Sequence, residues 1–191
     1  MFYHALKIIE EQCIGCTHCI SVCPTEALRI KHGKAYLIPE RCVDCGRCMR
    51  ACPYKAIIVE QDDFNQIFNY KIRVALIPAV FIGQFPRNIP VRSIYQAILT
   101  QGFTNVFEAE LGAGILQELI TELYDSKVKP VISSFCPSIV RLIQVKFPSL
   151  IENIMLLRSP LYITARAIFE TFKNRGYKSE EIGIFYVTPC A

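Results

Sequence analysis

Long hydrophobic segments are absent from this 191-residue sequence. The best candidate, residues 74–82, is short and contains Pro78, whereas a membrane-spanning helix needs about 18–20 apolar residues. The N-terminus also lacks the basic flank and apolar stretch of a secretory signal peptide. The net charge of +4 is too small to indicate nucleic-acid binding by itself. We therefore expect a cytoplasmic protein with no membrane insertion and no nucleic-acid partner.

Charged residues are scarce as well, at 20% of the sequence against 52% hydrophobic residues, which excludes intrinsic disorder. Cysteine, in contrast, is abundant and unevenly distributed. Eight of the ten cysteines lie between Cys13 and Cys52, and only Cys136 and Cys190 follow. Without an export signal we expect a reducing compartment, so metal ligation is favoured over a disulfide framework.

The eight N-terminal cysteines belong to two copies of the motif C-x-x-C-x-x-C-x-x-x-C-P, which begin 29 residues apart at Cys13 and Cys42. Three thiolates at this spacing reach three irons of one cubane, and the cysteine before proline ligates the neighbouring cluster. A zinc ribbon, the alternative, uses two separated C-x-x-C pairs and needs neither the third nor the fourth cysteine. The expected ligands of two 4Fe–4S clusters are Cys13, Cys16, Cys19 and Cys52 for one, and Cys42, Cys45, Cys48 and Cys23 for the other.

Between the two copies, residues 28–31 and 34–38 alternate in polarity around His32 and Gly33, which predicts a β-hairpin. Residues 1–60 therefore resemble the α+β two-cluster module of bacterial ferredoxins. They carry eight Lys or Arg against six Asp or Glu, so the strong acidity of a free ferredoxin is missing. A basic face that docks an acidic ferredoxin and an ordinary solvated surface are both compatible with this charge. His4 and His32 belong to no recognisable motif.

Residues 61–71 are more polar and are predicted to be a connector, and residues 72–191 then alternate between strand-like and helix-like segments. Uniformly apolar strands between helices indicate a parallel sheet that is covered on both faces. We predict an α/β lobe with a mostly parallel sheet of about five strands. The predicted strands are 72–82, 106–109, 130–135, 154–157 and 182–187, and the predicted helices are 90–101, 113–126, 137–147 and 160–175.

Cys136 and Cys190 each follow a predicted strand, at the sheet edge where open α/β folds build their sites. Pro137 opens a helix, so the sulfur of Cys136 lies where a helix N-terminus favours a thiolate. The alternative is a pair of buried structural cysteines.

The motifs around these cysteines resemble the catalytic domain of iron-only (FeFe) hydrogenases, which usually follows a ferredoxin module. That family has Thr-Ser-Cys-Cys-Pro-x-Trp, Lys-Ser-Pro and Met-Pro-Cys-x-x-Lys motifs in this order. The resemblance implies that Cys136 and Cys190 ligate the cubane of the six-iron H-cluster, with two further cysteines beyond Ala191. We thus expect a truncated chain, inactive by itself. The matching segments are 133–137, 147–148, 158–160 and 188–191.

Several departures from the family pattern concern proton transfer, which needs groups that titrate near the working pH. Phe135 replaces the proton-donating cysteine, and residues 82–85 lack the carboxylates of the family's Gly-Glu-Glu-Phe stretch. The expected serine falls within residues 155–157, which are Met-Leu-Leu, and the motif's tryptophan is absent. These losses argue against fast hydrogen turnover and resemble the sensory branch of the family.

The sequence thus predicts electron transfer through two 4Fe–4S clusters to or from an H-cluster-type site. A completed chain would be a hydrogenase-like oxidoreductase, with the rest of that domain and an electron-transfer protein such as a ferredoxin as partners. One alternative is a hydrogen- or redox-sensing regulator with a downstream signalling domain. Another is a two-cluster ferredoxin whose α/β lobe is a metal-free docking scaffold.

Overall fold

The computed structural model describes residues 4–114, 116–117, 120, 129–155 and 157–188. Internal contacts divide the chain into two compact units. Unit 1 contains the described residues of 1–61 and 130–155, and unit 2 contains those of 62–129 and 156–189. Among the described helices, none is both long enough and apolar enough to cross a membrane.

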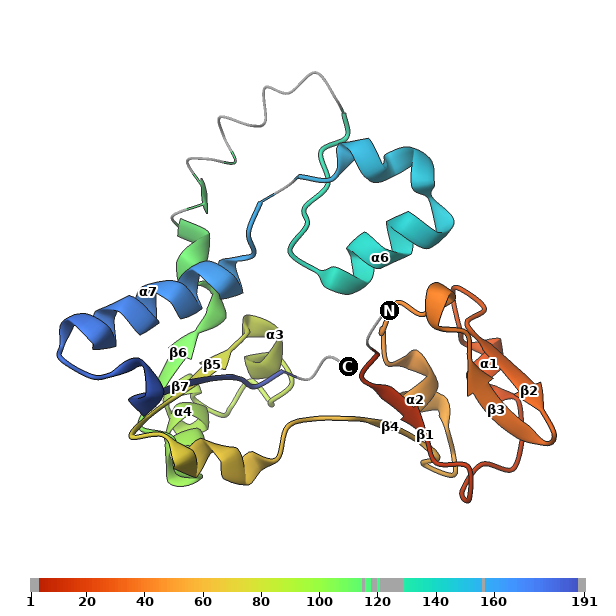
Figure 1. Cartoon of the computed structure of the whole chain (residues 1–191), viewed down its shortest axis with the longest axis horizontal. Helices are drawn as coiled ribbons and strands as arrows, with labels where there is room; N and C mark the ends of the chain where they lie inside the picture. Colours follow the sequence, from red (N-terminus) through yellow and green to blue (C-terminus); the bar gives the residue numbers. More distant parts are fainter. Residues whose placement is uncertain (1–3, 115, 118–119, 121–128, 156, 189–191) are drawn as a thin grey trace. The chain divides into compact units, whose positions relative to one another are not determined.

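Residues 4–61 of unit 1 form a small α+β module with two antiparallel strand pairs (Figure 1). Strand β1 (Leu6–Ile8) pairs with β4 (Ile57–Val59), and β2 (Leu28–Lys31) pairs with β3 (Lys34–Leu37). The β2–β3 pair is the hairpin that the sequence predicts. His32 and Gly33 both have positive φ, at 51° and 74°, as the tight turn of a two-residue hairpin requires.

Two short helices complete the module, each after a C-x-x-C loop. Helix α1 spans His18–Ser21 and α2 spans Arg47–Ala51. A 3-10 turn, η1 (Pro39–Arg41), precedes the second loop. The core of this module consists largely of thiols and small side chains rather than of large aliphatic ones. Its buried members are Leu6, Cys13, Cys19, Ala27, Leu28, Ala35, Cys42, Cys48, Ala56 and Ile57.

The remainder of unit 1 is helix α6 (Pro137–Lys146) and the 3-10 helix η4 (Pro148–Asn153). Here the predicted strands 130–135 and 154–157 are wrong. Within the described residues, this region forms one parallel bridge, between Ile132 and Ile154, outside the sheet of unit 2. Two backbone hydrogen bonds of 2.8 Å hold this bridge, from the Ile132 amide to the carbonyl of Asn153 and from the Met155 amide to the carbonyl of Ile132.

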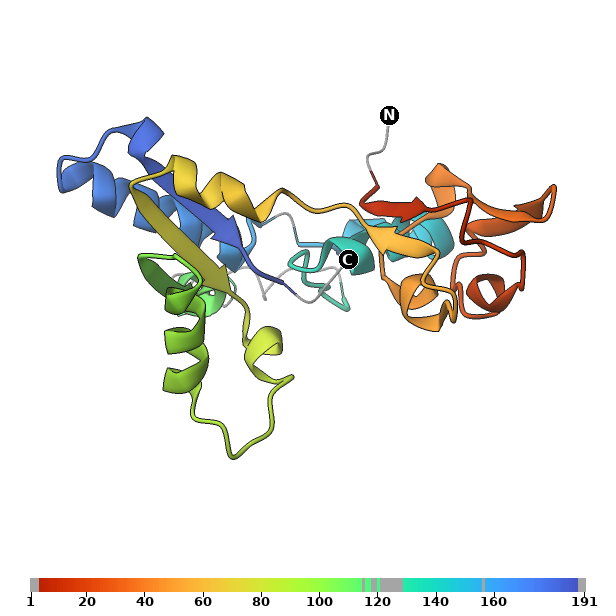
Figure 2. The same cartoon turned by 90° about the horizontal axis from the view of Figure 1, so that it is seen from below.

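Unit 2 is built on a three-stranded parallel sheet in the order β6–β5–β7, smaller than the predicted sheet of about five strands. The central strand β5 (Ile72–Ile77) lies between β6 (Asn105–Glu108) and β7 (Ile182–Tyr186). Helix α4 (Val91–Thr100) and helix α7 (Pro160–Asn174) cover opposite faces (Figure 2).

Side chains of β5 alternate between these two faces, as the period of two in a strand dictates. Ala75 and Ile77 pack with the buried side of α4, whereas Val74 and Leu76 pack with Ile168 and other residues of α7. Because both faces of β5 are covered, residues 74–77 of this strand form an uninterrupted apolar run, which is typical of parallel sheets. The mixed α/β character of this part of the chain thus agrees with the sequence prediction.

Some predicted boundaries change. The strand predicted at 72–82 ends at Ile77, because Pro78 precedes the short helix α3 (Ala79–Ile82). The predicted connector contains the 3-10 helix η2 (Phe64–Asn69), whose Ile67 is buried against the α4 side of the sheet. Most of the helix predicted at 113–126 lies outside the described residues. Two 3-10 turns, η3 (Ala109–Gly112) and η5 (Ser179–Glu181), also belong to the unit.

Candidate metal centres

Four cysteines of the module surround an open cavity of about 330 Å³ next to the β2–β3 hairpin. Three of them come from the first copy of the motif, and the fourth comes from the second copy. Gly15, in the loop beside this cavity, has φ +71°, and a Cβ atom there would lie 2.5 Å from the carbonyl oxygen of Gly33. Glycine therefore allows the loop to pack against the hairpin turn. The cysteines of this first site are Cys13, Cys16, Cys19 and Cys52.

The other four cysteines of the module surround a second open cavity, of about 300 Å³, with the roles of the two copies exchanged. Asp44 occupies the position that Gly15 has in the first copy, also with positive φ, at 48°. The cysteines of this second site are Cys23, Cys42, Cys45 and Cys48. The fold therefore brings together both groups of four cysteines that the motif spacing selects.

Backbone amides point at the sulfur atoms in both sites. In the first site, Ala35 N–H donates to Cys13 Sγ and Ala56 N–H to Cys52 Sγ, both at 3.3 Å. In the second site, Ala27 N–H donates to Cys23 Sγ at 3.2 Å, and Asp44 N–H to Cys42 Sγ at 3.4 Å. Such donors orient thiolate ligands and stabilise their negative charge.

Burial strongly disfavours unligated thiolates at these positions. It raises the pKa of Cys42 to about 12 and that of Cys48 to about 11, and it also raises the pKa of Cys19. A coordinated metal reverses this preference, because a thiol that binds a metal cation loses its proton. Four thiols around a mainly apolar cavity, with amide donors to sulfur, therefore fit an iron–sulfur cluster.

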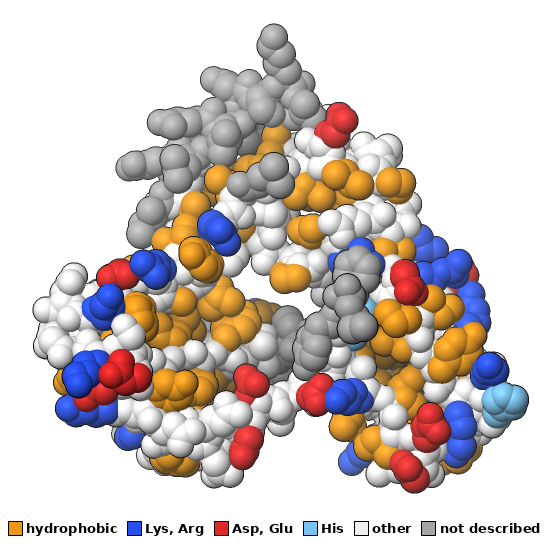
Figure 3. Space-filling model, viewed as in Figure 1, with side chains coloured by type: hydrophobic (Ala, Val, Ile, Leu, Met, Phe, Trp, Pro, Cys, Tyr) orange, Lys and Arg blue, Asp and Glu red, His pale blue; other side chains and the backbone are white. Residues whose placement is uncertain are grey.

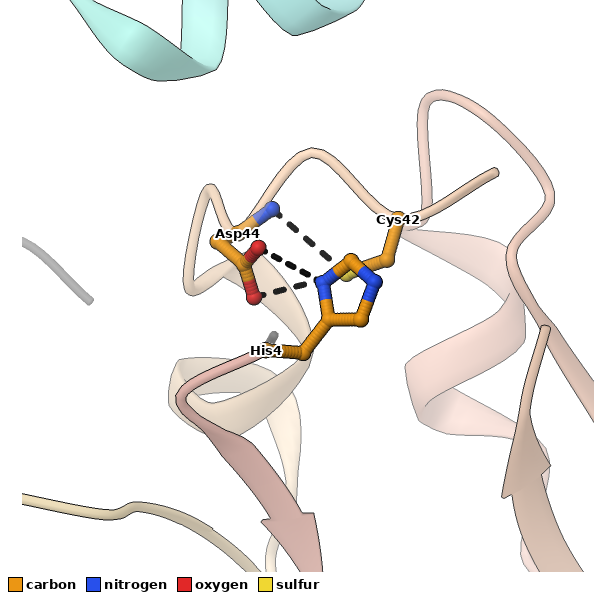
Figure 4. Close-up of side chains that lie close together, drawn as sticks. All are labelled: His4, Cys42 and Asp44. Atoms are coloured by element: carbon orange, nitrogen blue, oxygen red, sulfur yellow. Dashed lines mark hydrogen bonds and ion pairs between the residues drawn. The ribbon is translucent and has the colours of Figure 1, made fainter. Parts of the chain in front are cut away.

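His4 and Asp44 lie beside Cys42 and were not singled out by the sequence reasoning (Figure 4). His4 Nδ1 is 2.7 Å from Asp44 Oδ2, and the His4 side chain is only 9% exposed. Forty residues separate the two partners in the sequence. The sequence feature that could have drawn attention to this pair is Asp44 itself, which replaces the glycine at the equivalent position of the first motif copy, Gly15.

Cys136 is exposed and lies at the N-cap of α6, with Pro137 in the first turn. This is the helix start that the sequence predicts. Cys190 lies outside the described residues. Helix α6 also contacts the module: Ser138 Oγ donates to the carbonyl of Asp44 at 3.4 Å, and the Arg141 guanidinium donates to the carbonyl of Glu40 at 2.8 Å. The helix that begins at Cys136 is therefore attached to the loop of the second site.

Carboxylates occur in unit 2 where β6 ends. Glu108 accepts a hydrogen bond from the Tyr95 hydroxyl, and Glu110 accepts one from the amide of Ala79 at 2.9 Å. Burial and the hydrogen bond to Glu108 raise the pKa of Tyr95 to about 12. Open α/β sheets build their sites at the carboxyl ends of the strands, which is where Glu108 and Glu110 lie. The sequence analysis did not select either carboxylate or Tyr95.

The surface charges of unit 1 are partly paired. Glu26 lies within 4.0 Å of three cations, which belong to Arg29, Arg41 and Lys146. Figure 3 shows Lys and Arg side chains next to Asp and Glu side chains on the visible face of the molecule. Exposed ion pairs of this kind contribute little to stability. Glu26 and its three cationic partners together retain an excess of positive charge.

Two family models match the chain. Residues 71–191 match the iron only hydrogenase large subunit, C-terminal domain, and residues 12–56 match a 4Fe-4S dicluster domain. No curated protein matches the sequence.

Proposed function

Since the chain belongs to the iron-only hydrogenase large-subunit family, we propose that its N-terminal module carries electrons through two 4Fe–4S clusters to or from an H-cluster-type site. The observation that carries this proposal is the grouping of eight cysteines into two sets of four, each around its own cavity. Bound clusters of this type accept and release one electron at a time.

The residues of the module have distinct roles in this function. The eight thiolates hold the clusters, and the amides that donate to sulfur fix the orientation of four of these ligands. Apolar side chains such as Ile30 and Ile57 line the first cavity and exclude water, which lowers the local dielectric constant and tunes the reduction potential.

Cys136 and Cys190 are the proposed ligands of the H-cluster cubane. The attachment of α6 to the Asp44 loop supports electron exchange with the second site, because both belong to unit 1. As its electron partner we propose a small acidic protein such as a ferredoxin, which the excess positive charge around Glu26 favours. The rate of electron transfer between this acidic partner and the chain should then fall as ionic strength rises.

A specific observation favours the sensing alternative over turnover. Phe135 precedes Cys136, and its hydrocarbon ring can neither donate nor accept a proton where the family has a cysteine. In a chain completed with the two further cysteines of the family, we therefore expect Phe135→Cys to raise hydrogen evolution with a reduced viologen as electron donor. An unchanged rate would contradict the proton-transfer argument for a sensor.

Iron content and the EPR spectrum of the reduced protein test the cluster proposal. Two cubanes require about eight irons per chain, and metal held at Cys136 adds to that number. Cys45→Ser should reduce the iron content by up to about four, because it removes a ligand of one cubane. Cys136→Ser is the matched control and should retain both module clusters. A protein that binds zinc and shows no reduced-cluster EPR signal would refute the proposal.

A further inference from the structure

Asp44 makes contacts in the second cluster site through both its backbone and its side chain, whereas its counterpart Gly15 can make only backbone contacts. Its amide donates to Cys42 Sγ at 3.4 Å, its carbonyl accepts from Ser138, and its carboxylate binds His4 at 2.7 Å. The other carboxylate oxygen lies 3.7 Å from Cys42 Sγ. Gly15 has no side chain, and even a Cβ atom there would collide with the backbone of Gly33.

His4 is held firmly beside Asp44. It lies two residues before β1, which pairs with β4, and its side chain is more than nine-tenths buried. Because an ionised carboxylate only accepts hydrogen bonds, Nδ1 is the donor to Asp44. Among the described residues, Nε2 is buried and has no hydrogen-bond partner. Burying this polar ring costs free energy, and the hydrogen bond to Asp44 compensates for part of that cost.

The two cluster sites are otherwise closely matched. Each receives two backbone N–H···S hydrogen bonds, to one cysteine of each motif copy. The second site has one more weak contact, at 3.8 Å between the Thr25 hydroxyl and Cys23 Sγ. The carboxylate and imidazole next to Cys42 are therefore one electrostatic difference between the sites, and Arg47, which lines the second cavity where the first has His18, is another.

We propose that Asp44 and His4 are positioning residues that set the reduction potential of the second cluster apart from that of the first. This inference rests on the proposed function of the cysteine sites. Reduction adds one negative charge to a cluster, and a carboxylate near a ligand sulfur opposes that charge. Asp44 therefore lowers the potential of the second cluster. The N–H group of His4 offsets part of the carboxylate charge and keeps the carboxylate in place.

EPR-monitored redox titration of the reconstituted full chain tests this proposal. Asp44→Asn removes the charge and keeps an acceptor for His4, so one cluster potential should rise while the other stays constant. Asp44→Gly reproduces the first-copy residue at a positive φ, and should raise the same potential. Glu60→Gln is the control, because it removes an equal charge from an exposed ion pair with Lys7 in the same module. It should leave both potentials nearly unchanged.

The His4 variants separate the two residues' contributions. His4→Phe exposes Cys42 to the full carboxylate charge, so the potential should fall, opposite to the effect of Asp44→Asn. His4→Gln retains an N–H donor and should restore most of the original value. The inference would be overturned, with the clusters intact, if His4→Phe shifted the reduction potential in the same direction as Asp44→Asn. It would also be overturned if no variant shifted a reduction potential. Failure of the unmodified chain to assemble two clusters would instead refute the proposed function.

Discussion

The cysteine module and the parallel sheet have interiors of different kinds. Four of the ten buried core residues of the module are cysteines and three are alanines, so little aliphatic surface is buried there. The core of the sheet consists mostly of β-branched, leucine and aromatic side chains, and Val74, Ala75 and Ile77 have no exposed surface. From this contrast we expect the folding of the module to depend on bound metal clusters, whereas the sheet unit is stabilised by its own hydrophobic core.

Removal of iron should reveal this contrast most strongly. A chelator applied under reducing conditions should unfold the module, because its thiols then line two cavities with nothing to bridge them. The sheet unit should remain folded. Hydrogen exchange read by mass spectrometry checks this prediction, with loss of amide protection expected over residues 6–59 and retained protection over β5. Equal loss of protection in both regions would show that the two units fold as one.

A core truncation in the sheet should have the opposite effect: it should destabilise unit 2 and leave the cysteine module unchanged. Leu76 is 1% exposed and packs with the buried face of α7, so Leu76→Ala should reduce the free energy of unfolding of unit 2 by about 2–5 kcal/mol. The visible absorbance of the clusters should not change. Urea denaturation followed by circular dichroism measures the effect, and Val80→Ala, at a position that is 55% exposed, is the control.

The same contrast explains which features the sequence could predict. The hairpin and both cysteine sites depend on local spacing, which the repeat displays directly. The strand count depends on where residues 130–155 pack, and Arg141 and Ser138 attach this segment to the module rather than to the sheet. The contact between His4 and Asp44 spans 40 residues, and no local pattern marks such a pair.

Two neighbouring glycines offer a finer test of packing in the sheet unit. A Cβ atom on Gly112 would lie 2.6 Å from the carbonyl oxygen of Pro160 and 2.9 Å from Thr164 Oγ1, which accepts a hydrogen bond from the Gly112 amide. Gly112→Ala should therefore destabilise unit 2 by about 1–3 kcal/mol.

Gly114→Ala is the matched control, because no described atom lies within 4 Å of its Cβ position. It should stabilise the unit by about 0.4–1 kcal/mol, through the lower entropy of the unfolded chain. Thermal unfolding of both variants checks the opposite signs, and destabilisation of equal size would contradict the steric argument.

The smallest expected effect concerns an exposed carboxylate that precedes β7. The amide of Lys178 donates to Glu181 Oε2 at 2.8 Å, and this hydrogen bond, followed by the nearby Lys71, lowers the pKa of Glu181 below its ordinary value of 4.5. A carboxyl group whose pKa is lowered by folding stabilises the folded state above its unfolded pKa. That contribution disappears as the pH falls from about 5 through the lowered pKa.

Glu181→Gln should therefore flatten the acid side of the stability curve of unit 2 slightly and leave the clusters unaffected. Urea midpoints between pH 3 and 7, approximately, measure the difference, and Glu180→Gln is the control on the adjacent residue. If the two variants had the same pH dependence, the hydrogen bond from Lys178 would contribute nothing to the stability of the sheet unit.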